Sequence, residues 1–63
     1  MSTIEKIKEL VELMTEDTDK VYNKGNRSAS IRARKYAQEI KTLLGTFRKE
    51  ILDEIKRQDA TEN

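Results

Sequence analysis

The chain has 63 residues, of which 40% are charged and 35% hydrophobic, and its formal net charge is only +1. It contains no Cys and no His, which excludes a disulfide framework and a Cys/His zinc site, so we expect neither a metal nor a cofactor. A chain of this length forms one domain at most and buries a marginal core, so we expect it to fold firmly only with a partner, most simply a second copy.

Residues 3–23 form the first predicted element, an amphipathic helix. Ser2 followed by Glu5 fits a capping box, which begins a helix. Charged residues interrupt the apolar ones throughout, unlike in a signal peptide or a membrane span, so we expect a cytoplasmic protein without membrane contact. The apolar stripe advances in steps of three and four residues and consists of Ile4, Ile7, Val11, Met14, Thr18 and Val21, with Leu10 and Leu13 widening it.

A short turn is predicted at residues 24–27. Gly25 can adopt the left-handed conformation that ends a helix, and Asn26 or a following serine can cap the next helix. We therefore expect the chain to fold back on itself here.

The second predicted element is a longer helix over residues 28–57. Gly45 interrupts it at a cost of about 1 kcal/mol relative to Ala, either as a tolerated residue or because another helix or a ligand approaches closely. Residues 59–63 lack the apolar pattern and are expected to fray, which leaves residues 1–58 as the domain. The centre of the stripe consists of Ala33, Ala37, Ile40, Leu44, Phe47 and Ile51, and its edges of Tyr36, Leu43 and Ile55.

These elements predict an all-α fold, a two-helix antiparallel hairpin with a long second helix. About a third of that helix has no partner within the chain, so two hairpins are expected to assemble as a dimeric helical bundle. The residues expected in the core or the dimer interface are Ile7, Val11, Met14, Val21, Tyr36, Ile40, Leu43, Leu44, Phe47 and Ile51.

Charge is distributed unevenly along the chain. Residues 1–19 carry two basic against six acidic side chains, residues 20–49 nine basic against one acidic, and residues 50–63 two basic against five acidic. Because a hairpin brings both termini towards one end, we expect an acidic base and a basic tip. A solvated face is the ordinary explanation of charged helices, but the near absence of acids in the middle segment favours a polyanion as partner.

Within the basic segment, four residues recur every seven positions and form a basic ridge beside the apolar stripe: Arg27, Arg34, Lys41 and Arg48. The start of the second helix offers free amides and small polar side chains, which can hold a phosphate at the positive end of the helix dipole. The residues expected to bind DNA are Lys20, Lys24, Gly25, Asn26, Arg27, Ser28, Ser30, Arg32, Arg34, Lys35, Lys41, Arg48 and Lys49.

The stretch KGNRSASIRARK, followed twelve residues later by FRKE, resembles the bacterial linker-histone-like proteins of the chlamydial developmental histone type. The resemblance implies a DNA-binding, chromosome-compacting protein without enzymatic activity. Chlamydial members continue into a long tail rich in Lys and Ala, whereas this chain has an acidic end, so the helical part alone is expected to carry the binding. The shared pattern, within about residues 20–55, consists of Lys24, Gly25, Asn26, Arg27, Ala29, Arg32, Arg34, Arg48, Lys49 and Glu50.

The predicted function is therefore non-sequence-specific binding of double-stranded DNA by a histone-like, nucleoid-associated protein through phosphate contacts. Two alternatives stay open: a helical module for protein–protein interaction or scaffolding, and an RNA-binding protein, because RNA offers the same phosphates. An enzyme is not expected, since no nucleophile with a base partner forms a recognisable motif.

Overall fold

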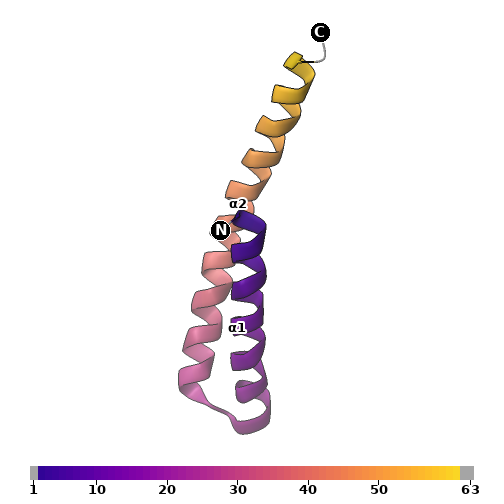
Figure 1. The fold of residues 1–63 in the computed structure, drawn as a ribbon. Coiled ribbons are helices and arrows are strands. Elements are labelled where there is room, and N and C mark those ends of the chain that lie inside the picture. The colour runs from indigo at the N-terminus through magenta and orange to yellow at the C-terminus, as the bar shows by residue number, and fades with distance from the viewer. Residues whose placement is uncertain (1, 62–63) are drawn as a thin grey trace.

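Over residues 2–61, the computed structural model contains two α-helices and no strand. Helix α1 spans Thr3–Lys24 and helix α2 spans Arg27–Thr61, and the two run side by side in opposite directions (Figure 1). The all-helical fold expected from the sequence is thus confirmed. The start of α1 is capped by the Ser2 hydroxyl, which accepts a hydrogen bond from the Glu5 amide at 3.2 Å.

The connection between the helices consists of Gly25 and Asn26. Gly25 has φ +60° and ψ +31°, the left-handed conformation, and its amide donates to the carbonyl of Val21 at 2.9 Å. The Gly25 bond is the one that defines the αL motif at a helix C-terminus, and the Asn26 amide donates in addition to the carbonyl of Lys20 at 3.3 Å. The Asn26 side chain then caps α2, because its Oδ1 accepts from the Ala29 amide at 3.0 Å. Two residues are therefore enough to reverse the chain.

We expect Gly25→Ala to destabilise the hairpin by about 1–2 kcal/mol, because an L side chain in the left-handed conformation clashes with the backbone. In a domain of this size, 1 kcal/mol corresponds to a change of about 4–8 °C in the melting temperature. Circular dichroism during heating measures this change.

Gly45→Ala is the matched control for this substitution. Gly45 lies inside α2, and a Cβ added there meets nothing within 4 Å. The control should therefore stabilise the protein by about 1 kcal/mol through helix propensity. A shift of the same sign for both substitutions would contradict the assigned role of Gly25.

The core of the chain is a narrow seam between the two helices. Its most buried side chains are Ile7 and Leu10 of α1, which are 7% and 6% exposed, and Ala29 of α2. The seam residues of α2 are small near the turn and larger further along. The seam on α2 advances in steps of four and three residues and consists of Ala29, Ala33, Tyr36, Ile40, Leu43 and Phe47. On α1 it includes the half-buried side chains of Met14, Thr18 and Val21.

This seam lies to one side of the predicted stripe. Of the residues expected in the core or the dimer interface, Val11, Leu44 and Ile51 are exposed in the single chain, with 40%, 47% and 48% of their surface accessible. The predicted stripe is wider than the surface that one neighbouring helix covers. The two-residue connection places Ala29 against the end of α1. The edge of the apolar stripe that contains Tyr36 and Leu43 therefore faces α1.

The C-terminal end of α2 extends beyond the predicted limit. Residues 59–61, which were expected to fray, belong to the helix, and residues 62 and 63 lie outside the described part of the chain. Side-chain pairs one turn apart stabilise this end, since Glu54 accepts hydrogen bonds from Arg57 and Gln58.

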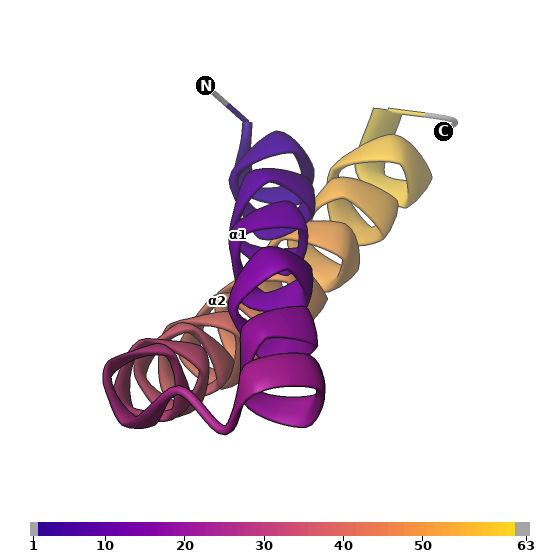
Figure 2. The ribbon, with the colours of Figure 1, turned by 90° about the horizontal axis from the view of Figure 1, so that it is seen from below.

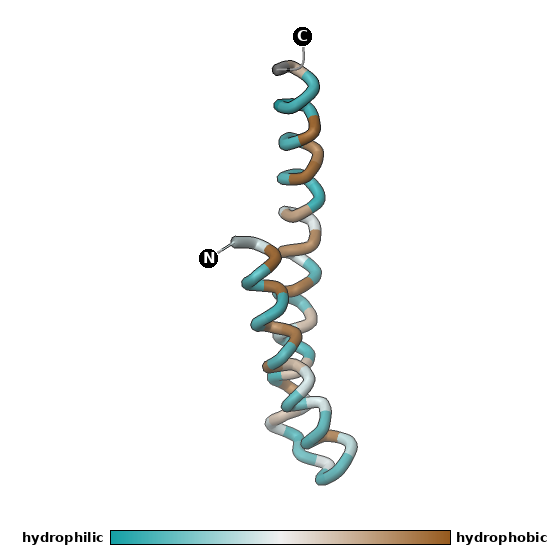
Figure 3. Tube along the Cα trace, turned by 45° about the vertical axis from the view of Figure 1, so that its right-hand side comes forward, coloured by the Kyte–Doolittle hydropathy of each residue, from teal (hydrophilic) through white to brown (hydrophobic). Residues whose placement is uncertain are grey.

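The last third of α2 projects beyond α1. Thr3 at the start of α1 donates a hydrogen bond to Glu50 at 2.9 Å, and α2 continues past this contact (Figure 1). The projecting part carries Ile51, Leu52 and Ile55, all about half exposed, and Figure 3 shows hydrophobic segments in this part of α2. The described part of the chain measures 58 × 16 × 14 Å, and α2 crosses α1 at an angle (Figure 2). Within residues 2–61, neither helix combines the length and the apolar character that crossing a membrane requires.

Candidate nucleic-acid interface

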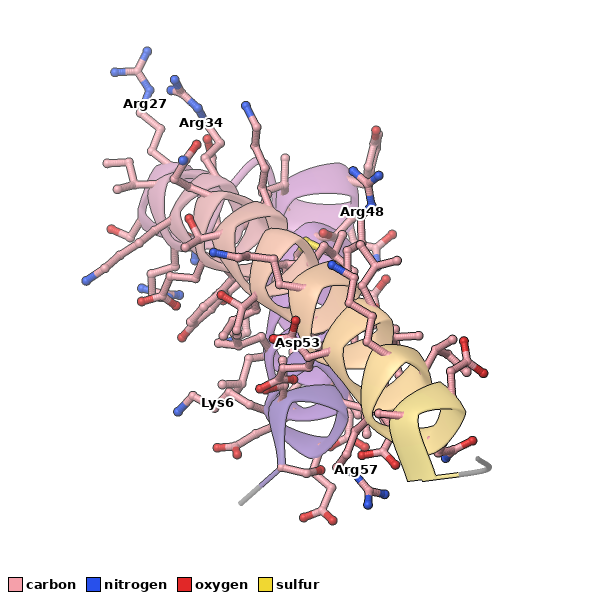
Figure 4. The ribbon with its side chains drawn as sticks, turned by 90° about the horizontal axis from the view of Figure 1, so that it is seen from above. Lys6, Arg27, Arg34, Arg48, Asp53 and Arg57 are labelled. Carbon is pink, nitrogen blue, oxygen red and sulfur yellow. The ribbon has the colours of Figure 1, made fainter. Side chains whose placement is uncertain are left out.

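The basic ridge lies on the outer face of α2, outside the contact with α1. Arg27 stands two positions before the seam residue Ala29, a rotation of about 200° around the helix, whereas the other three ridge residues each directly follow a seam residue, a rotation of about 100°. All four ridge residues are exposed. In Figure 4, the side chains of Arg27, Arg34 and Arg48 project to one side, and Lys6 of α1 projects to the other. The ridge is therefore an exposed feature of α2, and its Arg34 also borders a shallow hollow with Val21 and Tyr22 of α1.

A second row of basic residues lies beside the ridge on the same outer face. We call it the lysine row; its members Lys35, Lys49 and Lys56 are all exposed. Lys35 and Lys49 directly follow ridge residues, so the two rows are about 100° apart around α2. Lys56 was not among the predicted DNA-binding residues. Its spacing of seven from Lys49 is the signal that identifies it, although it lies in a segment of negative net charge.

The side chains of both rows are free to bind a ligand. Within residues 2–61, none of them takes part in an ion pair, because the two recorded pairs join Arg32 to Asp17 and Arg57 to Glu54. An anionic ligand would meet these cations without first having to displace a carboxylate. The outer face of α2 is thus the most accessible concentration of positive charge in the described chain.

Charge is separated between the two sides of the rod as well as along it. Helix α1 has four lysines against six acidic residues, whereas residues 27–50 of α2, which lie beside it, have seven basic against two acidic residues. The predicted acidic base and basic tip therefore describe only part of the distribution. At the tip itself, Lys20 and Lys24 share a shallow hollow with Glu16 and Asp19. Because α1 runs along α2, its acids form a lateral acidic face.

The start of α2 offers a smaller anion site than predicted. The side chain of Asn26 already accepts a hydrogen bond from the Ala29 amide. The backbone carbonyl of Asn26 accepts one from the Ser30 amide at 3.2 Å. Among the described residues, the amides of Arg27 and Ser28 have no recorded partner. The Ser28 side chain is exposed and that of Ser30 is half-buried, so two amides, one hydroxyl and the guanidinium of Arg27 are available to a phosphate.

Arg32, a predicted DNA ligand, is bound to Asp17 of α1. Its Nε lies 3.1 Å and its Nη2 3.0 Å from the Asp17 carboxylate oxygens. Asp17 is only 5% exposed. The hydrogen bonds from Arg32 lower the pKa of this carboxyl below its ordinary value, against the opposing effect of burial. The guanidinium therefore connects the two helices, which limits its use as a phosphate ligand.

Asp17 itself was absent from the predicted core. It follows Ile7, Leu10 and Met14 in the same alternation of three and four residues, so the spacing places it on the seam. An acid on an apolar seam predicts a basic partner on the facing helix, because a buried carboxylate without one is costly. That signal was available in the sequence.

We expect Asp17→Asn to lower the denaturation midpoint at pH 7, because it leaves Arg32 without its anionic partner. The pKa of Asp17 is lower in the folded state than the unfolded value of about 3.9. The pair therefore contributes stability above about pH 4 and loses it as pH falls through the lowered folded value.

Urea denaturation between pH 2 and 7 measures this dependence. The difference in stability between the parent and Asp17→Asn should shrink towards the acid end. Asp19→Asn is the matched control, because Asp19 is exposed and forms no ion pair with another described residue. Equal pH profiles of the two variants would exclude the proposed role of the Asp17–Arg32 pair.

Comparison with known proteins places this surface in context. A protein-family model described as histone H1-like protein Hc1 matches residues 1–57. No curated protein and no solved structure gave a match. The matched range includes both helices up to Arg57 and goes beyond the stretch of about residues 20–55 on which the resemblance rested.

Proposed function

Because the chain belongs to the histone H1-like Hc1 family, a class of non-enzymatic DNA-binding chromatin proteins, we propose that it binds double-stranded DNA without sequence specificity and organises the nucleoid. The observation that carries this proposal is the outer face of α2, where the ridge and the lysine row present cations that no acid neutralises. Phosphates of the DNA backbone are the ligands that such a surface binds.

The composition of this surface explains the lack of sequence preference. Arg and Lys bound to phosphates position a protein on the duplex but carry no sequence information. The ridge extends for about 31 Å along α2, at 1.5 Å per residue, which is long enough to contact several phosphates. The tip adds Lys20, Lys24 and the free amides at the start of α2, all exposed at the end of the rod.

A series of mobility shifts at rising salt tests the proposal. We expect a mixed-sequence duplex to be retarded at low ionic strength, with the logarithm of the affinity falling by about 0.9 per phosphate contact for each tenfold rise in salt. Several unrelated duplexes should bind alike. Absence of retardation at low salt would refute DNA binding.

We further propose that the chain acts as a homodimer. Ile4 and Val11 on α1 and Leu44 and Ile51 on α2 are all 40% or more exposed, and they follow the seam on the same flank of both helices. A second hairpin packed on this flank would remove the apolar side chains from water, as in a four-helix bundle. The ridge borders this flank without belonging to it, so a dimer leaves its cations free. Light scattering should give twice the chain mass of 7.4 kDa.

A further inference from the structure

Gly45 lies at the centre of the basic outer face of α2. On a helix, the surface neighbours of a residue are those three and four positions away. For Gly45 these neighbours are Lys41, Thr42, Arg48 and Lys49, all of them exposed. We call these five residues the Gly45 patch. Three cations and a hydroxyl thus surround the one position of the patch that has no side chain.

Nothing within the described chain explains a glycine at this position. A Cβ added to Gly45 meets no atom within 4 Å, and the residue has an ordinary helical conformation in the middle of α2. A glycine there is less favourable than alanine for helix formation. A glycine lets another molecule approach the backbone closely, and the open space around Gly45 leaves room for such an approach.

The rows around Gly45 match the shape of a DNA groove. A line of uncharged residues, Ile31, Gln38, Gly45 and Leu52, runs along α2 between the ridge and the lysine row. A helix with its side chains is about 10–12 Å across, and the major groove of B-form DNA is about 12 Å wide. A helix that enters this groove faces the base pairs with its central line and the two phosphate backbones with its flanks. Cations on both flanks and an uncharged line between them fit that geometry.

From these observations we propose that α2 lies in the major groove of duplex DNA, with the Gly45 patch at the point of closest approach. A straight helix touches a curved groove most closely at one place, and a residue without a side chain lets the backbone come nearest there. Lys41 and Arg48 then reach one phosphate backbone and Lys49 the other. This inference rests on the proposed DNA binding and adds the groove and the contact point.

The same geometry predicts discrimination between DNA and RNA. The major groove of an A-form RNA duplex is deep and narrow, and protein side chains cannot enter it as they do in B-form DNA. Duplex RNA should therefore bind only through the tip and the outer cations. We expect a lower affinity for RNA than for DNA of the same sequence at equal salt.

Gly45→Leu tests the contact point directly. The added side chain should weaken binding to a 24-base-pair mixed-sequence duplex about tenfold, the size of effect expected for overpacking a close contact. Thr46→Leu is the control, because it adds a leucine to the next exposed residue, about 100° away around α2. Circular dichroism should show both variants fully helical. Equal affinities of the two variants would overturn the proposal.

Probes of the two grooves test the binding mode in the parent protein. A duplex with glucosylated 5-hydroxymethylcytosine, whose sugars fill the major groove, should bind several-fold more weakly than the unmodified duplex. Netropsin, which occupies the minor groove, should leave binding to an A·T-rich duplex unchanged. Competition by netropsin without an effect of glucosylation, or equal affinity for duplex RNA, would overturn groove insertion. Absence of binding to every duplex would instead refute the proposed function itself.

Discussion

Reversal of two ridge charges, Arg34→Glu with Arg48→Glu, is expected to reduce duplex DNA affinity about 100-fold. Each lost charge-assisted contact is worth about 1.5 kcal/mol, and 1.4 kcal/mol corresponds to a factor of ten. The salt dependence should also become less steep by about 0.9 for each of the two lost phosphate contacts. A mobility-shift titration at several salt concentrations measures both quantities.

The double variant should remain folded. Both arginines are exposed, and neither takes part in a recorded ion pair among the described residues. Glutamate and arginine have similar helix propensities. The far-ultraviolet circular dichroism spectrum should therefore match that of the parent. Loss of helix in the variant would assign the two arginines a structural role instead.

A control with the same change in net charge separates the ridge from overall electrostatics. Lys6→Glu with Lys8→Glu also replaces two cations by two acids, but both positions belong to α1, and Lys6 points away from the ridge in Figure 4. This control should lose much less affinity, because the screening length at physiological salt is about 8 Å. Equal losses in the two variants would show that net charge, and not the ridge, decides binding.

Leu10→Ala is expected to unfold most of the protein. Leu10 is 6% exposed and lies at the centre of the seam. Truncation of a buried leucine costs about 2–5 kcal/mol, and a single core in a chain this small supplies no more than about 3–5 kcal/mol. The helical signal at 25 °C should therefore fall strongly, and urea denaturation should show no folded baseline.

Leu44→Ala makes the same substitution outside the seam and serves as the control. Leu44 is 47% exposed in the single chain, so its truncation should leave the hairpin helical. If Leu44 belongs to a dimer interface, light scattering should show a shift towards the monomer mass. A loss of helix equal to that of Leu10→Ala would mean that α1 packs against the Leu44 edge of α2 and not against Leu43.

The helices and the turn between them were predictable because their causes are local. Ser2 caps the first helix, and the left-handed Gly25 followed by the capping Asn26 makes the turn. Each of these interactions joins residues at most six positions apart, so the sequence contains all the partners. The end of α2 was less predictable, because pairs such as Glu54 with Arg57 and Gln58 extend the helix gradually, and no Gly or Pro marks where it stops.

The candidate interface was predictable where it depends on periodicity alone. A spacing of seven residues places Arg27, Arg34, Lys41 and Arg48 on one line of a helix whatever the helix packs against. The role of Arg32 was not predictable in the same way. It depends on Asp17, fifteen residues earlier, and on the seam that brings the two side chains within 3.0 Å. A count of formal charges along the sequence treats Asp17 and Arg32 as two separate solvent-exposed groups.

Two amphipathic helices, the turn at Gly25 and Asn26, the basic ridge and an excess of apolar residues over what a hairpin buries all follow from the order of the residues alone. Which edge of the α2 stripe meets α1 depends on how the two helices pack. The choice depends on how the two-residue connection sets the rotation of α2 and on which side chains then fill the space between the helices. The two edges of the apolar stripe of α2 are equally hydrophobic, so the hydrophobic pattern of the sequence cannot tell which edge faces α1. Packing distinguishes them, because Ala29 fits against the end of α1 and leaves Leu44 and Ile51 exposed.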